Sequence, residues 1–408
     1  MNDSGKTRKR FPVIGIVFLV ALLLRVPMIH LEPSLNNVHG ADAYQYKSIA
    51  HNLLKSGSYS IDGSTPTTYR PPMYSFFILG TYKSLGEGDM SIKIFQALMG
   101  AISVALVYWT GTLLMNPRAA LLGSLLMAVH PELVGLTAFV YSENVFILFI
   151  TAGVPITIIA ARRRDPRLFL LSGIIWGLAT LSRGVLLPIP VFMFLAFLLM
   201  RKGIKISLVW SASLGLGLFL VLFPWGVRNY RVTHSIMPVS EGLGAVLLHG
   251  NYVPFDGIYH YRETEDLLKR VAGNSTGAEM DRKFTRVALR NMAAQPIPTA
   301  RLVIRKAYRF WFDIYESVPN GKKRTVSAAL MLMLTSWHYL LLLAFATGAY
   351  LTRRSSELNI VYMVVLLITI VYALTTTTPR YRMSVLPHVC MIAGFSLYYL
   401  LSKRSSME

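Results

Sequence analysis

The chain has little charge, and the charge it has is mostly of one sign. Only 15% of its 408 residues are Asp, Glu, Lys or Arg, against about 25% in soluble globular domains. Hydrophobic residues make up 53%, and the mean hydropathy is +0.47. This composition excludes a single soluble domain and indicates a polytopic membrane protein. Cysteine is also nearly absent: Cys390 stands alone, so an intrachain disulfide is excluded.

Motifs of several enzyme classes are missing as well. The sequence contains no His-Glu-x-x-His, no Gly-x-Ser-x-Gly, no cysteine pair and no Gly-rich phosphate loop. His39 lies three residues before Asp42, so a pair of metal ligands is conceivable, but no third ligand is evident. We therefore predict no metal site and no required cofactor. A divalent metal is the less favoured alternative.

Long apolar runs are abundant. About ten spans can be drawn, at roughly 11–31, 91–114, 118–136, 143–160, 168–182, 184–200, 206–225, 326–350, 358–374 and 384–401. Alternating loops between them carry clusters of Lys and Arg, which mark the cytoplasmic side. An even number of spans puts both termini on that side. The prediction is an integral, multi-pass protein of the plasma (inner) membrane, with the N-terminal segment as an uncleaved anchor helix.

Two segments on the opposite, outer face are long. The first, 32–90, is polar; it contains a predicted amphipathic helix at Ala43–Lys55 and a short apolar helix at Met73–Leu85. The second, 228–325, has sixteen Lys/Arg against nine Asp/Glu and is the one candidate for a water-soluble domain. Its charge favours anionic headgroups or phosphates. Nucleic acid is excluded as a partner, because the segment lies outside the cytoplasm.

Charged residues at the ends of the spans gather at this outer face. They are Asp42, Glu143, Arg183, Arg228, Arg380 and Arg382. Charges next to apolar spans are costly and are usually functional or paired. One carboxylate with several arginines fits a general base beside a phosphate-bearing lipid.

Each of these residues also has a plain structural interpretation. Glu143 could cap a helix N-terminus, and Arg228 could anchor the interface beside Trp225. Arg183 could pair with an acid for packing. Arg380 and Arg382 could be ordinary loop charges. Their joint occurrence at one face favours a site over these separate explanations.

Several short motifs follow one another along nearly the whole chain. After the anchor helix come Ala41-Asp42-Ala43-Tyr44-Gln45-Tyr46, Arg70-Pro71-Pro72-Met73-Tyr74, Ser142-Glu143, Leu181-Ser182-Arg183, Pro224-Trp225-Gly226-Val227-Arg228-Asn229-Tyr230, Gly250-Asn251 and Arg380-Tyr381-Arg382. This order resembles the GT-C superfamily of integral-membrane glycosyltransferases, and more narrowly its protein O-mannosyltransferase and aminoarabinose-transferase branch. Many relatives have Asp-Glu where this chain has Asp42-Ala43, a departure that weakens any claim of a metal there.

The resemblance implies an all-α GT-C fold in three parts. These are a transmembrane module at 1–227 with a catalytic first outer loop at 32–90, a mostly helical extracytoplasmic domain at 228–325, and C-terminal transmembrane helices at 326–408. It further implies an inverting transfer of a hexosyl or pentosyl group from a polyprenyl-phosphate donor to a lipid, glycan or protein acceptor. The alternative is a lipid-linked sugar transporter or flippase.

On this interpretation Asp42 is the catalytic base. The donor phosphate is bound by Arg183, Arg380, Arg382 and Arg228. The substrate pocket includes His39, Tyr44, Tyr46, Tyr69, Arg70, Glu143 and Tyr381.

Overall fold

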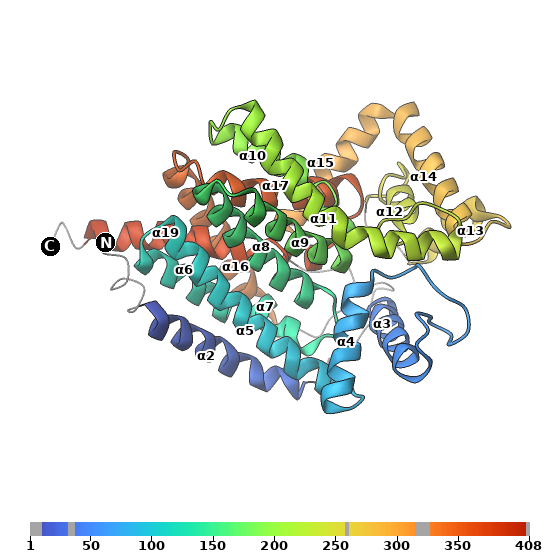
Figure 1. Ribbon diagram of the computed structural model, residues 1–408, viewed down its shortest axis with the longest axis horizontal. Coiled ribbons are helices and arrows are strands. Elements are labelled where there is room, and N and C mark those ends of the chain that lie inside the picture. Colours follow the sequence, from blue (N-terminus) through green and yellow to red (C-terminus); the bar gives the residue numbers. More distant parts are fainter. Residues whose placement is uncertain (1–9, 32–36, 258–260, 315–326, 405–408) are drawn as a thin grey trace.

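The computed structural model describes residues 10–31, 37–257, 261–314 and 327–404 (Figure 1). Within these ranges every regular element is a helix, and the one bridge between extended residues pairs Ser60 with Pro66. In chain order the helices are α2 (Arg10–Ile29), α3 (Asn37–Ser56), α4 (Pro72–Leu85), α5 (Asp89–Leu114), α6 (Pro117–Val129), α7 (Pro131–Gly135), η1 (Leu136–Ala138), α8 (Glu143–Arg163), α9 (Pro166–Ser182), η2 (Gly184–Leu186), α10 (Ile189–Leu199), α11 (Ile204–Thr233), α12 (Leu243–Gly250), α13 (Tyr261–Ala272), α14 (Gly277–Ala294), α15 (Pro296–Phe312), α16 (Ala328–Thr352), α17 (Leu358–Leu374), α18 (Pro379–Arg382) and α19 (Leu386–Arg404).

The predicted all-α, multi-pass membrane architecture is confirmed. Among the described residues, α2, α5, α8, α11 and α16 are each long and apolar enough to cross a bilayer. The chain bends by 54° between α6 and the segment formed by α7 and η1. If these two parts are counted together, they add a sixth span. Three further apolar helices, α9, α10 and α17, have 17 residues or fewer, whereas a straight span needs about 20. The number of about ten spans therefore stays a prediction.

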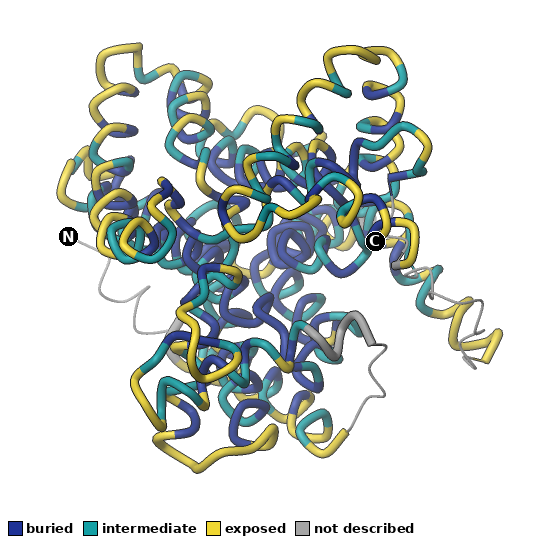
Figure 2. Tube along the Cα trace, turned by 90° about the vertical axis from the view of Figure 1, so that its right-hand side faces the viewer, coloured by how far each residue is buried: buried dark blue, intermediate teal, exposed yellow. Residues whose placement is uncertain are grey.

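The spans differ in how much of their surface the protein covers. In α2 and α16, 17% and 11% of the residues in the apolar window are buried, against 72% in α8. Figure 2 shows buried residues running through the middle of the bundle and exposed ones on its outward sides. Exposed apolar helix faces suit hydrocarbon, in which a helix satisfies its own backbone groups. The exposed apolar faces of α2 and α16 are therefore suited to contact lipid, whereas α8 is central.

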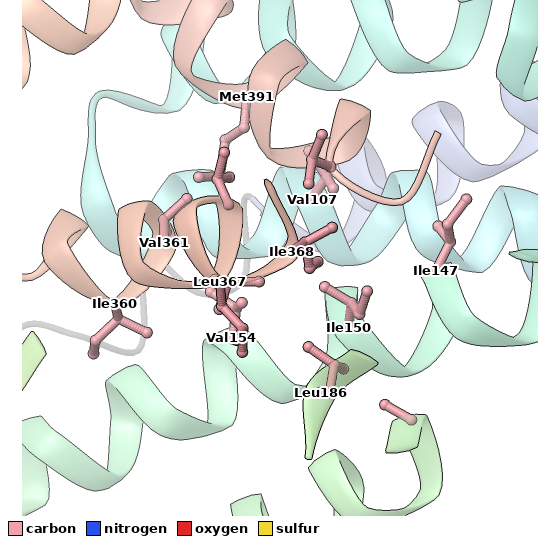
Figure 3. Packing of buried hydrophobic residues seen from close by; sticks show 14 of the residues in the cluster. Val107, Ile147, Ile150, Val154, Leu186, Ile360, Val361, Leu367, Ile368 and Met391 are labelled. Atoms are coloured by element: carbon pink, nitrogen blue, oxygen red, sulfur yellow. The ribbon is translucent and has the colours of Figure 1, made fainter. Parts of the chain in front are cut away.

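The centre of the bundle is a tightly packed apolar cluster. Figure 3 shows Val107, Ile150, Leu186, Ile368 and Met391 meeting there from five elements. Lipid tails are as apolar as these side chains, so close packing rather than removal from water holds the helices together. Helices α9 and α11 touch backbone to backbone: a Cβ added at Gly173 would lie 2.0 Å from the Leu214 carbonyl oxygen. A larger residue there would force the two helices apart.

The polar helices α3, α13 and α14 gather at one end of the bundle, together with α4 and α12 (Figure 1). Helix α2 begins and α19 ends at the left in Figure 1, whereas α3, α4 and α12 to α14 lie at the right. Helix α3 contains the predicted amphipathic helix and is longer at both ends. Helix α4 matches the predicted short apolar helix almost residue for residue. Helices α12 to α14 share a small core of their own around Leu248, Leu267 and Phe284. Helix α11 continues to Thr233, past the predicted domain boundary.

Candidate active site

Asp42 lies in α3, at the end of the bundle that also carries α4 and α12 to α14 (Figure 1). The same helix buries Ala43, Tyr46 and Ile49 against the protein, which fixes the side from which the carboxylate projects. Its Oδ1 contacts a guanidinium nitrogen of Arg70, and its Oδ2 accepts a hydrogen bond from Arg380 Nη1 at 3.1 Å. Both carboxylate oxygens are thus paired with arginine.

Arg70 is held in place by the turn that starts α4. Two prolines follow it, so Arg70 is biased toward extended backbone and Pro72 is well suited to open the helix. Its carbonyl accepts a hydrogen bond from the Tyr59 hydroxyl at 2.9 Å, and its Nε donates to Gln45 Oε1 at 2.7 Å. The guanidinium also lies 5.3 Å from the ring centre of Tyr46. The backbone and side chain of Arg70 are therefore both anchored.

Glu143 is the second acid of the site and the first residue of α8. It is completely buried, and the positive end of the helix favours a carboxylate there. Arg380 binds it as a fork, with Nε to Oε1 at 2.5 Å and Nη2 to Oε2 at 2.9 Å. Arg183, from the end of α9, forms an ion pair with Oε1 of the same carboxylate. Such bidentate pairs are geometrically specific as well as strong.

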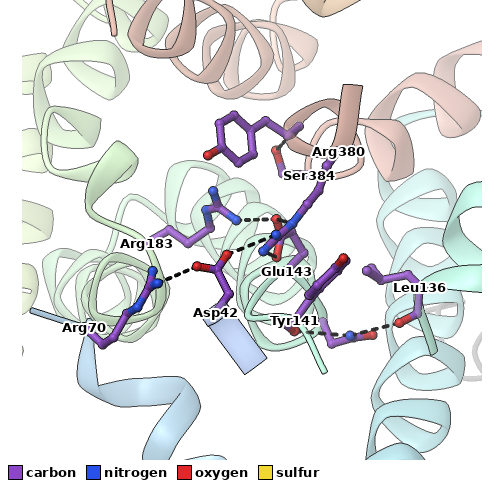
Figure 4. Close-up of polar contacts among 10 residues, drawn as sticks. Asp42, Arg70, Leu136, Tyr141, Glu143, Arg183, Arg380 and Ser384 are labelled. Atoms are coloured by element: carbon purple, nitrogen blue, oxygen red, sulfur yellow. Dashed lines mark hydrogen bonds and ion pairs between the residues drawn. The ribbon is translucent and has the colours of Figure 1, made fainter. Parts of the chain in front are cut away.

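These five side chains form one chain of alternating charge. In order they are Arg70, Asp42, Arg380, Glu143 and Arg183, as Figure 4 shows; we call this set the arginine–carboxylate cluster. Three cations against two anions leave a formal charge of +1. Aromatic rings support the guanidinium groups: Arg380 lies 3.7 Å from the centre of the Tyr141 ring, and Arg183 lies 4.6 Å from that of Tyr381. The net charge suits an anionic ligand.

The members of the cluster differ in their access to solvent. The side chain of Asp42 is 27% exposed and that of Glu143 is 1% exposed. An incoming group can therefore reach Asp42 but not Glu143. Burial alone would raise the pKa of Asp42, but the charges and hydrogen bonds of Arg70 and Arg380 outweigh it and hold this pKa below its ordinary value. Asp42 is consequently ionised at neutral pH.

Two predicted phosphate ligands lie outside the cluster. Arg382 is fully buried and binds Glu132 at 2.9 Å and the carbonyl oxygen of Asp313 at 2.6 Å. Arg228 donates to the Thr67 carbonyl at 2.6 Å and lies 4.9 Å from the centre of the Trp225 ring. Arg382 thus binds Glu132 and backbone carbonyl groups instead of Asp42 or Glu143, and its predicted role as a phosphate ligand stays a prediction. Its guanidinium also donates to the Phe310 carbonyl, so it contacts the end of α15.

The predicted pocket residues are placed unevenly. Arg70 and Glu143 belong to the cluster, and Tyr46 and Tyr381 contact it. Tyr69 stacks on Arg70 with its ring centre 5.0 Å away. Tyr44 is 63% exposed. The His39 side chain lies outside the described part of the structure. The roles assigned to these residues stay predictions.

Two supporting residues of the site were not predicted from the sequence. Gln45 accepts a hydrogen bond from Arg70, and Tyr141 stacks on Arg380. Their closeness in sequence to Asp42 and Glu143 was the signal available. Among the described residues, no group of three or more His, Cys, Asp or Glu side chains is placed to hold a metal ion.

Comparisons with known proteins agree with this architecture. Residues 69–227, which include Arg70, Glu143 and Arg183, match the family model described as dolichyl-phosphate-mannose-protein mannosyltransferase. An uncharacterized protein of Aquifex aeolicus (strain VF5) is 26% identical over 193 residues, which are 46% of this chain and 38% of that protein.

Solved structures give a similar result. The oligosaccharyltransferase AglB of Archaeoglobus fulgidus, solved with an inhibitory peptide and a dolichol-phosphate, matches with a TM-score of 0.58 and 15% identity. That match covers 98% of this chain and 51% of AglB, so the chain spans about half of AglB's length. ArnT of Cupriavidus metallidurans, bound to undecaprenyl phosphate, matches with a TM-score of 0.43 and 15% identity, over 95% of this chain and 78% of ArnT. The chain therefore has the GT-C fold of integral-membrane glycosyltransferases, and its residues 69–227 match the dolichyl-phosphate-mannose-protein mannosyltransferase family.

Proposed function

We propose that this protein is an inverting glycosyltransferase. It moves a hexosyl or pentosyl group from a polyprenyl-phosphate donor to an acceptor hydroxyl on a lipid, glycan or protein. The observation that carries the proposal is the arginine–carboxylate cluster, in which a partly exposed carboxylate shares arginines with a buried one. The match to a family that uses dolichyl-phosphate-mannose, and the dolichol-phosphate bound to AglB, support a lipid-phosphate donor.

The donor's phosphodiester carries one negative charge, which the net positive cluster attracts. Arg380 is the group best placed to bind it, because it already divides its donors between Asp42 and Glu143. Glu143 and Tyr141 keep the guanidinium oriented while one of its donors moves to the phosphate. Planar guanidinium groups bind phosphate oxygens bidentately, as they bind carboxylates.

Phosphate binding also prepares the base. In the free site, Asp42 is a weak base because two arginines hold its pKa down. When Arg380 turns to the phosphate, Asp42 loses one of these partners, and its pKa rises toward the range in which a carboxylate accepts a proton effectively. The donor thereby activates the residue that will deprotonate the acceptor.

The transfer is then a single displacement. The acceptor oxygen forms a bond to the anomeric carbon, the bond from that carbon to the phosphate oxygen breaks, and the acceptor proton goes to Asp42. Attack opposite the leaving group inverts the anomeric centre. The leaving lipid phosphate gains negative charge, which Arg380 and Arg183 stabilise more strongly than they stabilise the donor. A metal ion has no place in this sequence of steps.

The site faces the outside of the plasma membrane, with both termini in the cytoplasm. The basic clusters at Lys6–Arg10, Arg162–Arg164, Arg201–Lys205 and Arg353–Arg354 support this orientation. Helices α12 to α14 would then form the core of the extracytoplasmic domain. Protease added to intact cells should cleave within 234–296, and cleavage only after cell lysis would overturn the orientation.

The experiment is a donor panel with purified protein in nanodiscs. Synthetic polyprenyl phosphates carrying different hexoses or pentoses are mixed with candidate acceptors, and mass spectrometry follows free lipid phosphate and glycosylated product. NMR of the product then gives its anomeric configuration. Turnover by the wild type and not by Asp42→Asn is expected. Movement of intact lipid-linked sugar across vesicle membranes, with no glycosidic bond broken, would instead establish a flippase.

A further inference from the structure

Lys306 in α15 is a buried basic residue that lies far in sequence from the members of the arginine–carboxylate cluster. Its side chain is completely inaccessible to solvent. The ammonium donates to Asn251 Oδ1 at 2.9 Å and to the Thr375 carbonyl oxygen at 2.7 Å. No ion pair to a carboxylate is found for it among the described residues, and burial lowers its pKa to about 7. Burying a charged ammonium group without a carboxylate partner costs free energy, so the position of this lysine needs an explanation.

What Lys306 holds is the end of α17. The last residues of a helix leave carbonyl groups without partners inside the helix, and a cation there is favoured by the helix dipole. Lys306 binds the Thr375 carbonyl, and the neighbouring Asn251 donates to the Leu374 carbonyl at 2.8 Å. Asn251, which directly follows α12, and Lys306 of α15 thus cap a helix of the C-terminal bundle.

Glycines let these elements come close. A Cβ added at Gly250 would lie 1.9 Å from the Thr375 carbonyl oxygen, so α12 presses directly on the capped turn. A Cβ at Gly257, where φ is +87°, would lie 2.9 Å from Lys306 Cγ. The missing side chains at these two glycines therefore give the lysine and the capped turn the space that they occupy.

The capped turn leads straight into the active site. Thr375 has φ −102° and ψ −102°, and the chain then runs through Thr376–Thr378 into α18, which carries Arg380. The hydroxyl groups of these three threonines have no hydrogen-bond partner in the described structure. The segment is thus fixed at its start by the cap and at its end by the ion pairs of Arg380.

We propose that Lys306, together with Asn251, is a positioning residue for Arg380. It acts through the Thr375 carbonyl and ties the extracytoplasmic helices to the turn that brings a guanidinium between the two carboxylates. The kinetic test of this inference rests on the proposed function, whereas its structural test is independent of that function.

The kinetic test compares Lys306→Met with Arg305→Met. The control residue is exposed, basic and adjacent on the same helix. Misplacing a binding group by about 1 Å can cost about 100-fold in rate, so Lys306→Met should lower kcat/KM for the lipid-phosphate donor by about 10- to 100-fold. Arg305→Met should leave it nearly unchanged. The Lys306→Met, Arg380→Lys double variant should lose much less than the product of the two single losses, because both changes act on one group. Multiplicative losses would overturn the proposal.

The structural test measures hydrogen exchange of the full-length protein in nanodiscs. Peptides covering residues 379–385, where Met383 donates to the Arg380 carbonyl and Val385 to the Arg382 carbonyl, should exchange faster in Lys306→Met. Peptides from α5 and α8 should not change. If Lys306→Met does not fold, Asn251→Ala removes the bond to the Leu374 carbonyl and one hydrogen-bond acceptor of Lys306, and should increase exchange in the same peptides. Unchanged exchange at 379–385 would overturn the proposal. A wild type that transfers no sugar while this exchange still changes would overturn the proposed function alone.

Discussion

Two arginines only two residues apart on α18 serve different parts of the molecule. Arg380 enters a site where it bridges two carboxylates, one of them partly exposed. Arg382 is fully buried, where it binds one carboxylate and the carbonyl oxygens of Phe310 and Asp313. The residue type and the local helix are the same, but the surroundings differ in access and in the kind of acceptor.

This difference indicates that Arg380 is suited to bind a ligand, whereas Arg382 anchors the end of a helix. Carboxylate partners can be exchanged for a phosphate of similar geometry and charge, so under the proposed function Arg380 would switch from Asp42 to the donor phosphate. Backbone carbonyls that terminate α15 have no such substitute, and removing their partner would leave them buried and unsatisfied. Changes around Arg380 should therefore affect turnover, whereas changes around Arg382 should affect folding.

The largest effect is expected for Asp42→Asn compared with Glu132→Gln. Each change neutralises one acid beside one of the two arginines. Loss of a general base should lower kcat by about 10²–10⁴-fold. Donor KM should not rise, because the cluster becomes more positive. Glu132→Gln should keep kcat and lower the thermal unfolding temperature. Both quantities are measured on purified protein with a donor that the wild type uses.

The opposite pattern would refute this division. Full turnover in folded Asp42→Asn protein would leave Asp42 as a structural partner of Arg70 and Arg380. A loss of turnover by Glu132→Gln without a loss of stability would place Arg382 in the reaction.

Arg380→Lys and Arg382→Lys sharpen the comparison with a smaller change. Lysine keeps the charge but cannot form the fork that Arg380 makes with Glu143. About a tenfold rise in donor KM is expected for Arg380→Lys, from loss of one charge-assisted hydrogen bond. Arg382→Lys should leave the KM of the folded fraction unchanged and lower its thermal stability. Equal effects of the two variants on KM would show that both residues bind the donor.

The fold was predictable from the sequence where periodicity and length were strong. The length of the apolar runs indicated helices, and α3 and α4 lie almost where the amphipathic spacing and the short apolar run predict them. The number of membrane spans was harder to predict from the sequence. The run at 118–136 bends after Val129, and the run at 184–200 contains only an 11-residue α-helix. Hydropathy does not report where a helix breaks.

The site was predictable in part because membrane topology brings charges at helix ends to one face. That argument placed Asp42, Glu143, Arg183 and Arg380 at the same end of the bundle, and they do meet. It could not separate Arg380 from Arg382, since both lie in the same short turn. The direction of each side chain depends on the rotation of α18 and on partners from α7 and α15, which are far away in sequence.

The pH dependence tests whether Arg70 and Arg380 control the base. The pKa of Asp42 is lower in the folded protein than its unfolded value of about 3.9. Its ion pairs therefore stabilise the protein above that value, and this contribution is lost as the pH falls through the folded pKa. Wild-type kcat/KM should not depend on Asp42 between about pH 5 and 8. In Arg70→Gln, burial is less compensated, so the acid limb of the profile should move to higher pH. An unmoved limb would remove Arg70 from the control of Asp42.

The smallest expected effect is that of metal removal. Excess EDTA should leave transfer unchanged, because both oxygens of Asp42 already face guanidinium groups and Glu143 is occupied by two arginines. A hard divalent cation needs several oxygen ligands, and the adjacent positive charges would repel it. Inactivation by EDTA that a divalent ion reverses would contradict this, and would make His39, Asp42 and Glu143 the ligands to test. In that case the partners of Arg380 would have another role. The carboxylates that Arg380 now binds would serve as metal ligands, and Arg380 would differ from Arg382 by releasing a carboxylate to a metal ion instead of exchanging it for a phosphate.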